Sequence, residues 1–282
     1  MPSACVWINS SRVRKALGSN TQSMKLQLYV VFHKVLFRDA YERVSADAQN
    51  KYLRFFSVNS RLEKYFPARL QEYLIVECNL PWYNAFLQFN RFFENSALIH
   101  VNHNPELCEP FDYVGFCQYD MRLSNELFET VEKTLVNENS TTLFYHKKYL
   151  AYEHILQVFH LDGWRFIINR YNAIYGTSHT IDKIIISEIP LYNTFILPRE
   201  VFKRMMSFSE MCSSVFLELL QFETKHLPYH LERLHGVFLL LQTWDGLLHE
   251  WVELPGIEHD ESLKEACQAF PNAVSPDTKN SV

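Results

Sequence analysis

The chain has 282 residues, of which 48% are apolar and 15% aromatic, and this is enough to fill the core of one large domain. Its 27 basic and 32 acidic residues give a net charge of -5, which excludes the strongly positive surface of a general nucleic-acid binder. No stretch approaches ~20 uninterrupted apolar residues, and residues 1–23 lack the pattern of a secretory signal. We therefore expect a cytoplasmic protein without a transmembrane segment.

The first half of the chain alternates between strand and helix patterns. Residues 1–24 form an appendage before the first strong signal, the apolar run of residues 26–32, which is typical of a buried strand. A helix-compatible stretch at residues 39–50 and a second strand at residues 52–58 follow. This alternation predicts an α/β fold.

The middle of the chain continues the alternation. Aromatic residues spaced by three and four between residues 80 and 93 predict a helix whose aromatic face packs into the core. Residues 111–119 predict a strand, residues 125–136 an amphipathic helix, and residues 141–145 another strand.

The second half, from Tyr149, is richer in helix patterns. Residues 149–175 predict helices interrupted near Gly163, and residues 183–189 predict a strand. Helices are also expected at residues 198–206, 210–222 and 231–242. Residues 263–282 are expected to form a flexible tail.

The strand around Gly115, with Asp120 directly after it, is the most informative segment for function. Gly115 permits a neighbouring chain to approach closely, and Gln118 and Asp120 would share one face of an extended strand. Mg²⁺ or Mn²⁺ takes oxygen ligands, and one or two carboxylates suffice when phosphates and waters complete the shell. The alternative, which residue types alone favour, is an Asp120 that caps the next turn.

Several common catalytic motifs are missing from the sequence. It contains no G-x-x-x-x-G-K-[ST] phosphate-binding loop and no G-x-S-x-G nucleophile elbow, and only seven glycines. Kinase, dehydrogenase and serine hydrolase functions therefore lose support.

Four segments resemble, in matching order, a glycosyltransferase family found in bacterial capsule-polysaccharide loci and in giant algal viruses. These segments are residues 30–34, residues 113–121, residues 192–199 and residues 230–234, and together they span roughly residues 25–259. Bacterial members usually carry His-Tyr-Arg-Arg after the glycine strand, whereas this chain has Gln-Tyr-Asp-Met-Arg at residues 118–122. The resemblance is therefore closer to the viral branch.

This resemblance implies a GT-A-like single domain with a mixed, mostly parallel central sheet flanked by helices. Residues 25–148 would form the nucleotide-sugar-binding half, and residues 149–262 the acceptor-binding half. The implied reaction is inverting, metal-assisted transfer of xylose from UDP-xylose to a glycan acceptor, such as a fucose of a viral N-glycan. The implied cofactor is Mn²⁺ or Mg²⁺, and the implied location of a viral member is the host cytosol.

The resemblance also assigns the reacting groups. Asp120 would bind the donor and the metal, Gln118 replaces the first carboxylate of the usual Asp-x-Asp pair, and His259 is the candidate second metal ligand. Glu232 is the candidate general base, since a helix start would stabilise its charge while apolar neighbours desolvate it. The alternative for Glu232 is an ion pair with Arg233, which is as well supported by the residues alone.

Further donor and acceptor contacts are expected around these groups. His33, Lys34, Asn59 and Arg61 follow the first two strands, where an open α/β sheet presents its ligand crevice, although solvated strand ends explain them equally well. The acceptor candidates are Trp164, Tyr192, Asn193 and Arg233, because sugars are commonly held by aromatic faces and hydrogen-bonding side chains. Core packing explains Trp164 equally well.

Two functions from other classes stay open. A glycan-binding module that keeps the fold without catalysis is favoured by Gln118, which weakens the metal pair. A metal-dependent phosphoesterase would use Asp120 with His33 or His259, but the histidines lack a recurring ligand spacing.

Overall fold

The computed structural model describes residues 25–58, 72–137, 141–155, 161–219 and 224–269. Its centre is a seven-stranded sheet in the order β10-β6-β9-β4-β1-β2-β3. The strands are β1 (Leu26–Phe32), β2 (Leu53–Ser57), β3 (Leu74–Val76), β4 (Tyr113–Gln118), β6 (Thr142–Tyr145), β9 (Phe195–Pro198) and β10 (Glu250–Glu253). Only β9 runs antiparallel to its neighbours, so the expected mixed, mostly parallel α/β sheet is confirmed.

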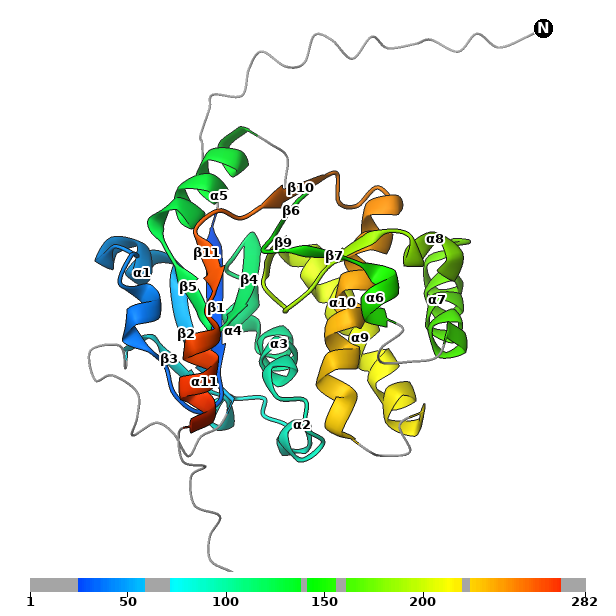
Figure 1. Cartoon of the computed structure of the whole chain (residues 1–282), viewed down its shortest axis with the longest axis horizontal. Helices are drawn as coiled ribbons and strands as arrows, with labels where there is room; N and C mark the ends of the chain where they lie inside the picture. Colours follow the sequence, from blue (N-terminus) through cyan, green and yellow to red (C-terminus); the bar gives the residue numbers. More distant parts are fainter. Residues whose placement is uncertain (1–24, 59–71, 138–140, 156–160, 220–223, 270–282) are drawn as a thin grey trace, which may run out of the picture.

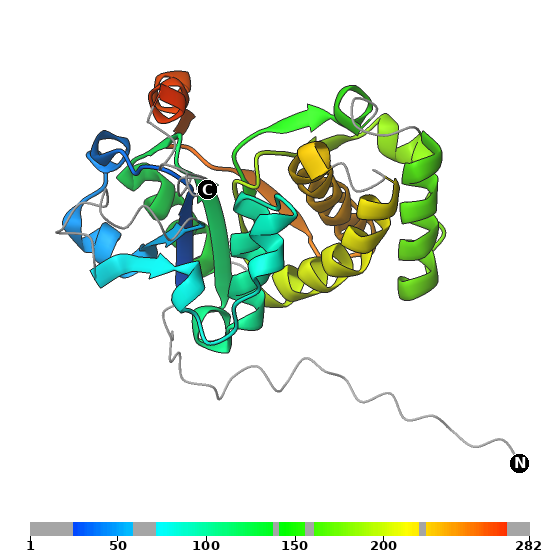
Figure 2. The same cartoon turned by 90° about the horizontal axis from the view of Figure 1, so that it is seen from below.

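Helices cover both faces of this sheet (Figures 1 and 2). One face packs against α1 (Ala46–Tyr52), α5 (Asn125–Asn137) and α11 (Glu261–Ala269). The other packs against a larger layer that contains α3 (Glu94–His103), α7 (Leu161–Tyr175), α9 (Arg199–Leu219) and α10 (Leu227–Trp244). The short helices are α2 (Ala85–Phe89), α4 (Pro105–Cys108), α6 (Ala151–Ile155) and α8 (Ile181–Ile185), with 3-10 turns at Arg38–Tyr41, Glu77–Asn79 and Thr224–His226.

The sequence of β1 explains why two layers of helices are needed. Every residue from Leu26 to Phe32 is buried. Successive side chains of a strand point to opposite faces, so Leu28 and Val30 enter one core while Tyr29 and Val31 enter the other. A continuous apolar run is typical of a strand that is covered on both sides.

The register of the strands gathers distant segments at one edge of the sheet. β1 and β4 are parallel with Val31 opposite Gln118, so His33 and Asp120 follow their strands at the same edge. β9 is antiparallel to β4, so the turn before Phe195 lies there too. A small antiparallel pair, β5 (Met121–Leu123) with β11 (Ile257–His259), sets His259 opposite Met121 and therefore beside Asp120.

Two glycines allow the close packing on which this edge depends. A Cβ on Gly115 of β4 would lie 2.6 Å from the Ile196 side chain of β9. A Cβ on Gly236 of α10 would lie 2.4 Å from the Pro190 carbonyl oxygen, at the end of β8 (Glu188–Pro190), which pairs with β7 (Lys148–Leu150). Only glycine lets α10 approach the segment that leads to Tyr192 this closely.

Some element predictions were wrong. Residues 183–189, expected as a strand, are divided between α8 and the start of β8, and the two helices expected at 198–206 and 210–222 are the single helix α9. The expected tail of residues 263–282 begins too early, because α11 extends to Ala269 and buries Leu263 and Cys267. No helix in the described part of the chain is both long and apolar enough to cross a bilayer.

Candidate functional site

A cavity of about 380 Å³ opens at the edge of the sheet where β1 and β4 end. Residues predicted from both halves of the chain line it: His33, Gln118, Asp120, Tyr192, Asn193, Glu232, Arg233 and His259. The structure therefore brings eight of the twelve predicted site residues to one place.

Asp120 lies at the base of this cavity with only 3% of its surface exposed. Oδ2 lies 3.2 Å from His259 Nε2, while Oδ1 is buried without a hydrogen-bond partner among the described residues. Burial raises the pKa of Asp120, and His259 opposes this shift. The shared strand face expected for Gln118 and Asp120 was wrong, because β4 ends at Gln118 and Asp120 belongs to the turn after it.

His259 completes a two-residue donor set for a cation. Its ring stacks on Tyr192, with 5.7 Å between the ring centroids and 15° between the planes, and its Nδ1 lies 3.5 Å from Glu261 Oε1. The described residues contain no group of three His, Cys, Asp or Glu side chains suited to a metal. The unpaired Oδ1 of Asp120 and the imidazole nevertheless fit a Mn²⁺ or Mg²⁺ ion whose remaining ligands are phosphate oxygens and waters.

Glu232 reaches the same cavity from the second turn of α10. Its Oε1 accepts a hydrogen bond from the Tyr192 backbone N–H at 2.9 Å and lies 3.7 Å from Arg233 Nη1. Burial raises the pKa of this carboxyl group, while Arg233 and the Tyr192 N–H oppose the shift. Glu232 thus faces the cavity, as a general base would have to, and it also pairs with Arg233, as the alternative drawn from the sequence predicts.

The turn of Tyr192 and Asn193 joins the two sides of the cavity. Both residues have positive φ, 68° and 46°, which is uncommon for residues other than glycine. Asn193 Oδ1 lies 2.8 Å from His235 Nδ1, whose Nε2 lies 3.0 Å from Ser209 Oγ, and Asn193 Nδ2 donates to Asn95 Oδ1 at 2.9 Å. Burial lowers the pKa of His235 to about 3, so a neutral ring holds this turn.

Several cavity residues had not been predicted. Glu94, the first residue of α3, lies with its Oε1 3.3 Å from His33 Nδ1. Burial acts to raise the pKa of Glu94, but the neighbouring His33 outweighs it, so that pKa lies below its usual value. The other residues are Phe93, Asn95, Tyr119, Lys225, Pro228, Tyr229, Lys264 and Gln268. Their positions depend on α11 and on the starts of α3 and α10, and no sequence motif marks them.

The other four predicted residues have different outcomes. Trp164 is fully buried on α7, where its Nε1–H donates to the Ile155 carbonyl, so core packing explains it and the predicted acceptor contact was wrong. Lys34 is half-buried but does not line the cavity. Asn59 and Arg61 lie outside the described residues.

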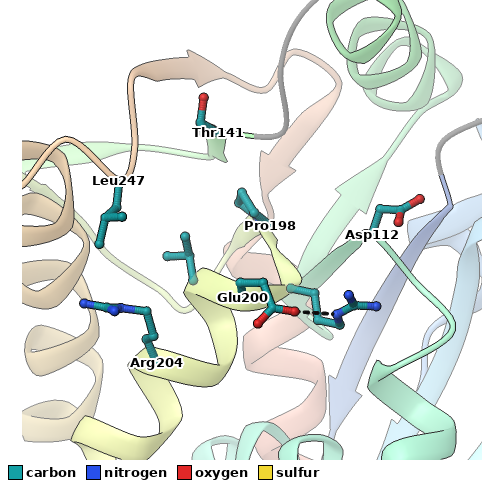
Figure 3. Close-up of a pocket in the computed structure, with 8 residues that line it drawn as sticks. Asp112, Thr141, Pro198, Glu200, Arg204 and Leu247 are labelled. Atoms are coloured by element: carbon teal, nitrogen blue, oxygen red, sulfur yellow. Dashed lines mark hydrogen bonds and ion pairs between the residues drawn. The ribbon is translucent and has the colours of Figure 1, made fainter. Parts of the chain in front are cut away.

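A second cavity, of about 330 Å³, lies at the opposite end of β4 and β9, near Asp112 and Pro198 (Figure 3). Its charged groups already have partners: Asp112 accepts from the Lys25 N–H at 2.9 Å, and Arg199 Nε lies 3.0 Å from Glu200 Oε1. Arg204 Nε donates to Gln242 Oε1 at 3.0 Å. This cavity offers a ligand few unpaired polar groups.

Comparisons with known proteins bear on the fold. No protein-family model matches the chain, and no curated protein matches it in sequence. Among solved structures, the bifunctional glycosyltransferase WbbM in its apo form superposes with a TM-score of 0.53 at 18% identity, over 82% of this chain and 44% of WbbM. This chain thus spans less than half the length of WbbM.

Two further solved structures superpose less closely. Mouse xyloside xylosyltransferase 1 has a TM-score of 0.40 at 12% identity, over 82% of this chain and 84% of that one. Core-mannan synthase A of Aspergillus fumigatus, in a Mn/GDP form, has a TM-score of 0.41 at 9% identity, over 89% and 78%. At 18% identity the superposition on WbbM concerns the fold alone, and it supports a GT-A-like α/β fold for this chain.

Proposed function

We propose that this protein is a metal-assisted glycosyltransferase that takes its sugar from a nucleoside diphosphate. The observation that carries the proposal is the buried Asp120, which lies beside His259 in the same cavity as Glu232 and has one carboxylate oxygen that no described residue pairs. A GT-A-like fold makes the carboxyl edge of the sheet the natural place for a nucleotide sugar.

Different residues of the cavity would bind different parts of the donor. Asp120 and His259 would hold a divalent metal, which when bound neutralises charge on the departing diphosphate. Lys225 and Lys264 line the same cavity and supply positive charge for the phosphate oxygens. His33 and Gln118 add polar groups at the ends of β1 and β4.

Glu232 is suited to accept the proton of the acceptor hydroxyl. The acceptor oxygen forms a bond to the anomeric carbon as the bond from that carbon to the diphosphate oxygen breaks. The proton would pass to Oε2 of Glu232, because Oε1 already accepts the Tyr192 N–H. Burial raises the pKa of Glu232 and so makes its carboxylate more basic than usual, while Arg233 opposes this shift.

The finer identity of the substrates is proposed from the sequence motifs. The order and the residues of the four motifs resemble those of a chlorella-virus xylosyltransferase. UDP-xylose is therefore the first donor to test, and a fucose of an N-glycan the first acceptor. Tyr192, Asn193 and Arg233 are in place to contact an acceptor sugar.

A panel of UDP-sugars incubated with Mn²⁺ tests the proposed function. We expect slow release of UDP from one sugar nucleotide, acceleration by a fucosylated acceptor, and loss of both when EDTA is added. A protein that binds oligosaccharide but no donor would instead be a glycan-binding module. Hydrolysis of simple phosphate esters without sugar transfer would indicate a phosphoesterase.

A further inference from the structure

Helix α2 exposes aromatic side chains that the sequence pattern assigns to the core. Phe86 is 70% exposed and Phe89 is 81% exposed, and their rings form an edge-to-face pair with centroids 6.5 Å apart. Exposed phenylalanines that gather on one element often mark a binding surface. The expected packing of this aromatic stripe into the core was therefore wrong for these two residues.

Helix α2 turns Leu87 and the amide of Gln88 inward and leaves both phenylalanines outside. Gln88, between the two rings in sequence, donates from Nε2 to Ser96 Oγ at 2.7 Å and to Glu77 Oε2 at 3.2 Å. Glu77 is only 2% exposed, and burial raises its pKa to about 7. Burying a carboxyl and an amide while exposing two phenylalanines lowers the free energy of unfolding. Arrangements of this kind are expected at positions that serve a function.

The chain that carries these rings continues through Phe93 to the cavity. Figure 1 shows α2 at the lower end of α3, on the side where α10 begins. Phe93, which is 41% exposed, connects the two elements with a φ of 49° and lines the cavity. Tyr229, at the start of α10, is 53% exposed and lines the cavity from the other side. Asn95 Nδ2 donates to the Pro228 carbonyl at 3.4 Å and joins the two walls.

We propose that Phe86, Phe89, Phe93 and Tyr229 form a binding surface for the outer sugar units of an oligosaccharide acceptor, beyond the unit that reacts at Glu232. This inference rests on the proposed function, because it makes the cavity the place of transfer. Aromatic faces bind the apolar C–H faces of pyranose rings, and exposed rings on neighbouring elements can contact successive units of a sugar chain. The acceptor is then an oligosaccharide and not a single sugar.

The surroundings of the rings favour a glycan over a lipid surface. Between Leu80 and Asn95 the charged residues are Arg91 and Glu94, which cancel, whereas anionic lipid surfaces attract clusters of basic residues. A few rings are also too small an area for a stable protein interface. Continuity with the cavity gives a glycan chain a defined direction.

Binding of the full chain to an array of one- to six-sugar oligosaccharides tests the inference without requiring turnover. We expect the bound set to consist of chains of three or more sugars, and Phe86→Ala/Phe89→Ala to weaken their binding about ten-fold. The matched control is Phe166→Ala/Ile174→Ala, which removes two exposed apolar side chains from α7 and should leave binding unchanged. Thermal unfolding should differ little between the two variants.

The outcomes separate this inference from the proposed function. Oligosaccharide binding that depends on the rings, without binding of any UDP-sugar, would uphold the surface and reject the transferase. Donor turnover with equal use of short and long acceptors by the parent and the α2 variant would overturn the inference. So would binding to no oligosaccharide, or ring-dependent binding to phosphatidylserine vesicles.

Discussion

The two cavities at opposite ends of β4 have similar volumes but different chemistry. The cavity beside Asp120 contains a buried carboxylate oxygen that has no partner in the described part of the chain, whereas the charged groups around Asp112 and Arg199 are paired with neighbours. Phe93, Tyr192 and Asn193, which have positive φ, line the first cavity, and none of the residues that line the second has such a backbone.

This difference teaches that volume alone does not identify a site in this fold. Unpaired buried groups and strained backbone oppose folding and persist only when the surrounding structure fixes them. Here both features occur at the end of the sheet where an open α/β fold binds ligands. Substitutions in the two cavities, at opposite ends of β4, should therefore differ in their effect on activity.

The largest effect is expected for Asp120→Asn. Loss of the charge removes the carboxylate proposed for the metal and diphosphate, so kcat/KM for sugar transfer should fall roughly 1000-fold. The matched substitution Asp112→Asn, in the second cavity, should leave kcat/KM unchanged. Equal losses of kcat/KM in the two variants would show that the two cavities do not differ in function.

Glu232→Gln is expected to slow the chemical step without weakening donor binding. Glutamine keeps the acceptor oxygen for the Tyr192 N–H but cannot take a proton, so kcat should fall at least about 100-fold. Titration of UDP-sugar by calorimetry should give an unchanged Kd. A parallel loss of donor affinity would place Glu232 in the donor site instead.

Substitutions in the turn of Tyr192 and Asn193 should reduce activity by a smaller factor, which depends on the residue introduced. Asn193→Ala removes the links to His235 and Asn95 and disfavours positive φ, so activity should fall about ten-fold. Asn193→Gly loses the same links but keeps the backbone preference, and should retain more activity. Identical kinetics for the two variants would show that backbone conformation does not limit catalysis.

The smallest effect concerns the pH profile of Arg233→Gln. Glu232 must be ionised to act as a base, so kcat/KM rises with pH through the pKa of Glu232. Arg233 opposes the rise of that pKa caused by burial, so its neutral replacement should move the acidic limb to higher pH. Arg233→Lys keeps the charge and should leave the limb near its original position.

Much of this site could be predicted from the sequence, for physical reasons. Asp120 follows a strand that contains a close-packed glycine, and Glu232 lies early in a helix whose second residue is Pro228. These local patterns left other roles open, and the family resemblance singled out both residues. His259 was identified by resemblance, and the β5–β11 pairing explains how it reaches Asp120.

The remaining features depend on tertiary contacts that no local pattern encodes. Glu94 and Lys264 reach the cavity only because α3 and α11 are oriented towards it. The periodicity of α2 correctly implied an amphipathic element, but Leu87 and Gln88 face inward, where Gln88 donates to the buried Glu77 and Ser96, and Phe86 and Phe89 stay exposed. Trp164 shows the opposite case: it was expected at the site but is buried in the core, where its ring N–H donates to the Ile155 carbonyl.

A crystal structure of the protein with UDP and Mn²⁺ would test the central claim most directly. We predict that the diphosphate and the metal lie against Asp120 and His259, with Glu232 facing the space left for an acceptor. Nucleotide bound instead beside Asp112 and Arg199, with Asp120 Oδ1 still unpaired, would contradict the account.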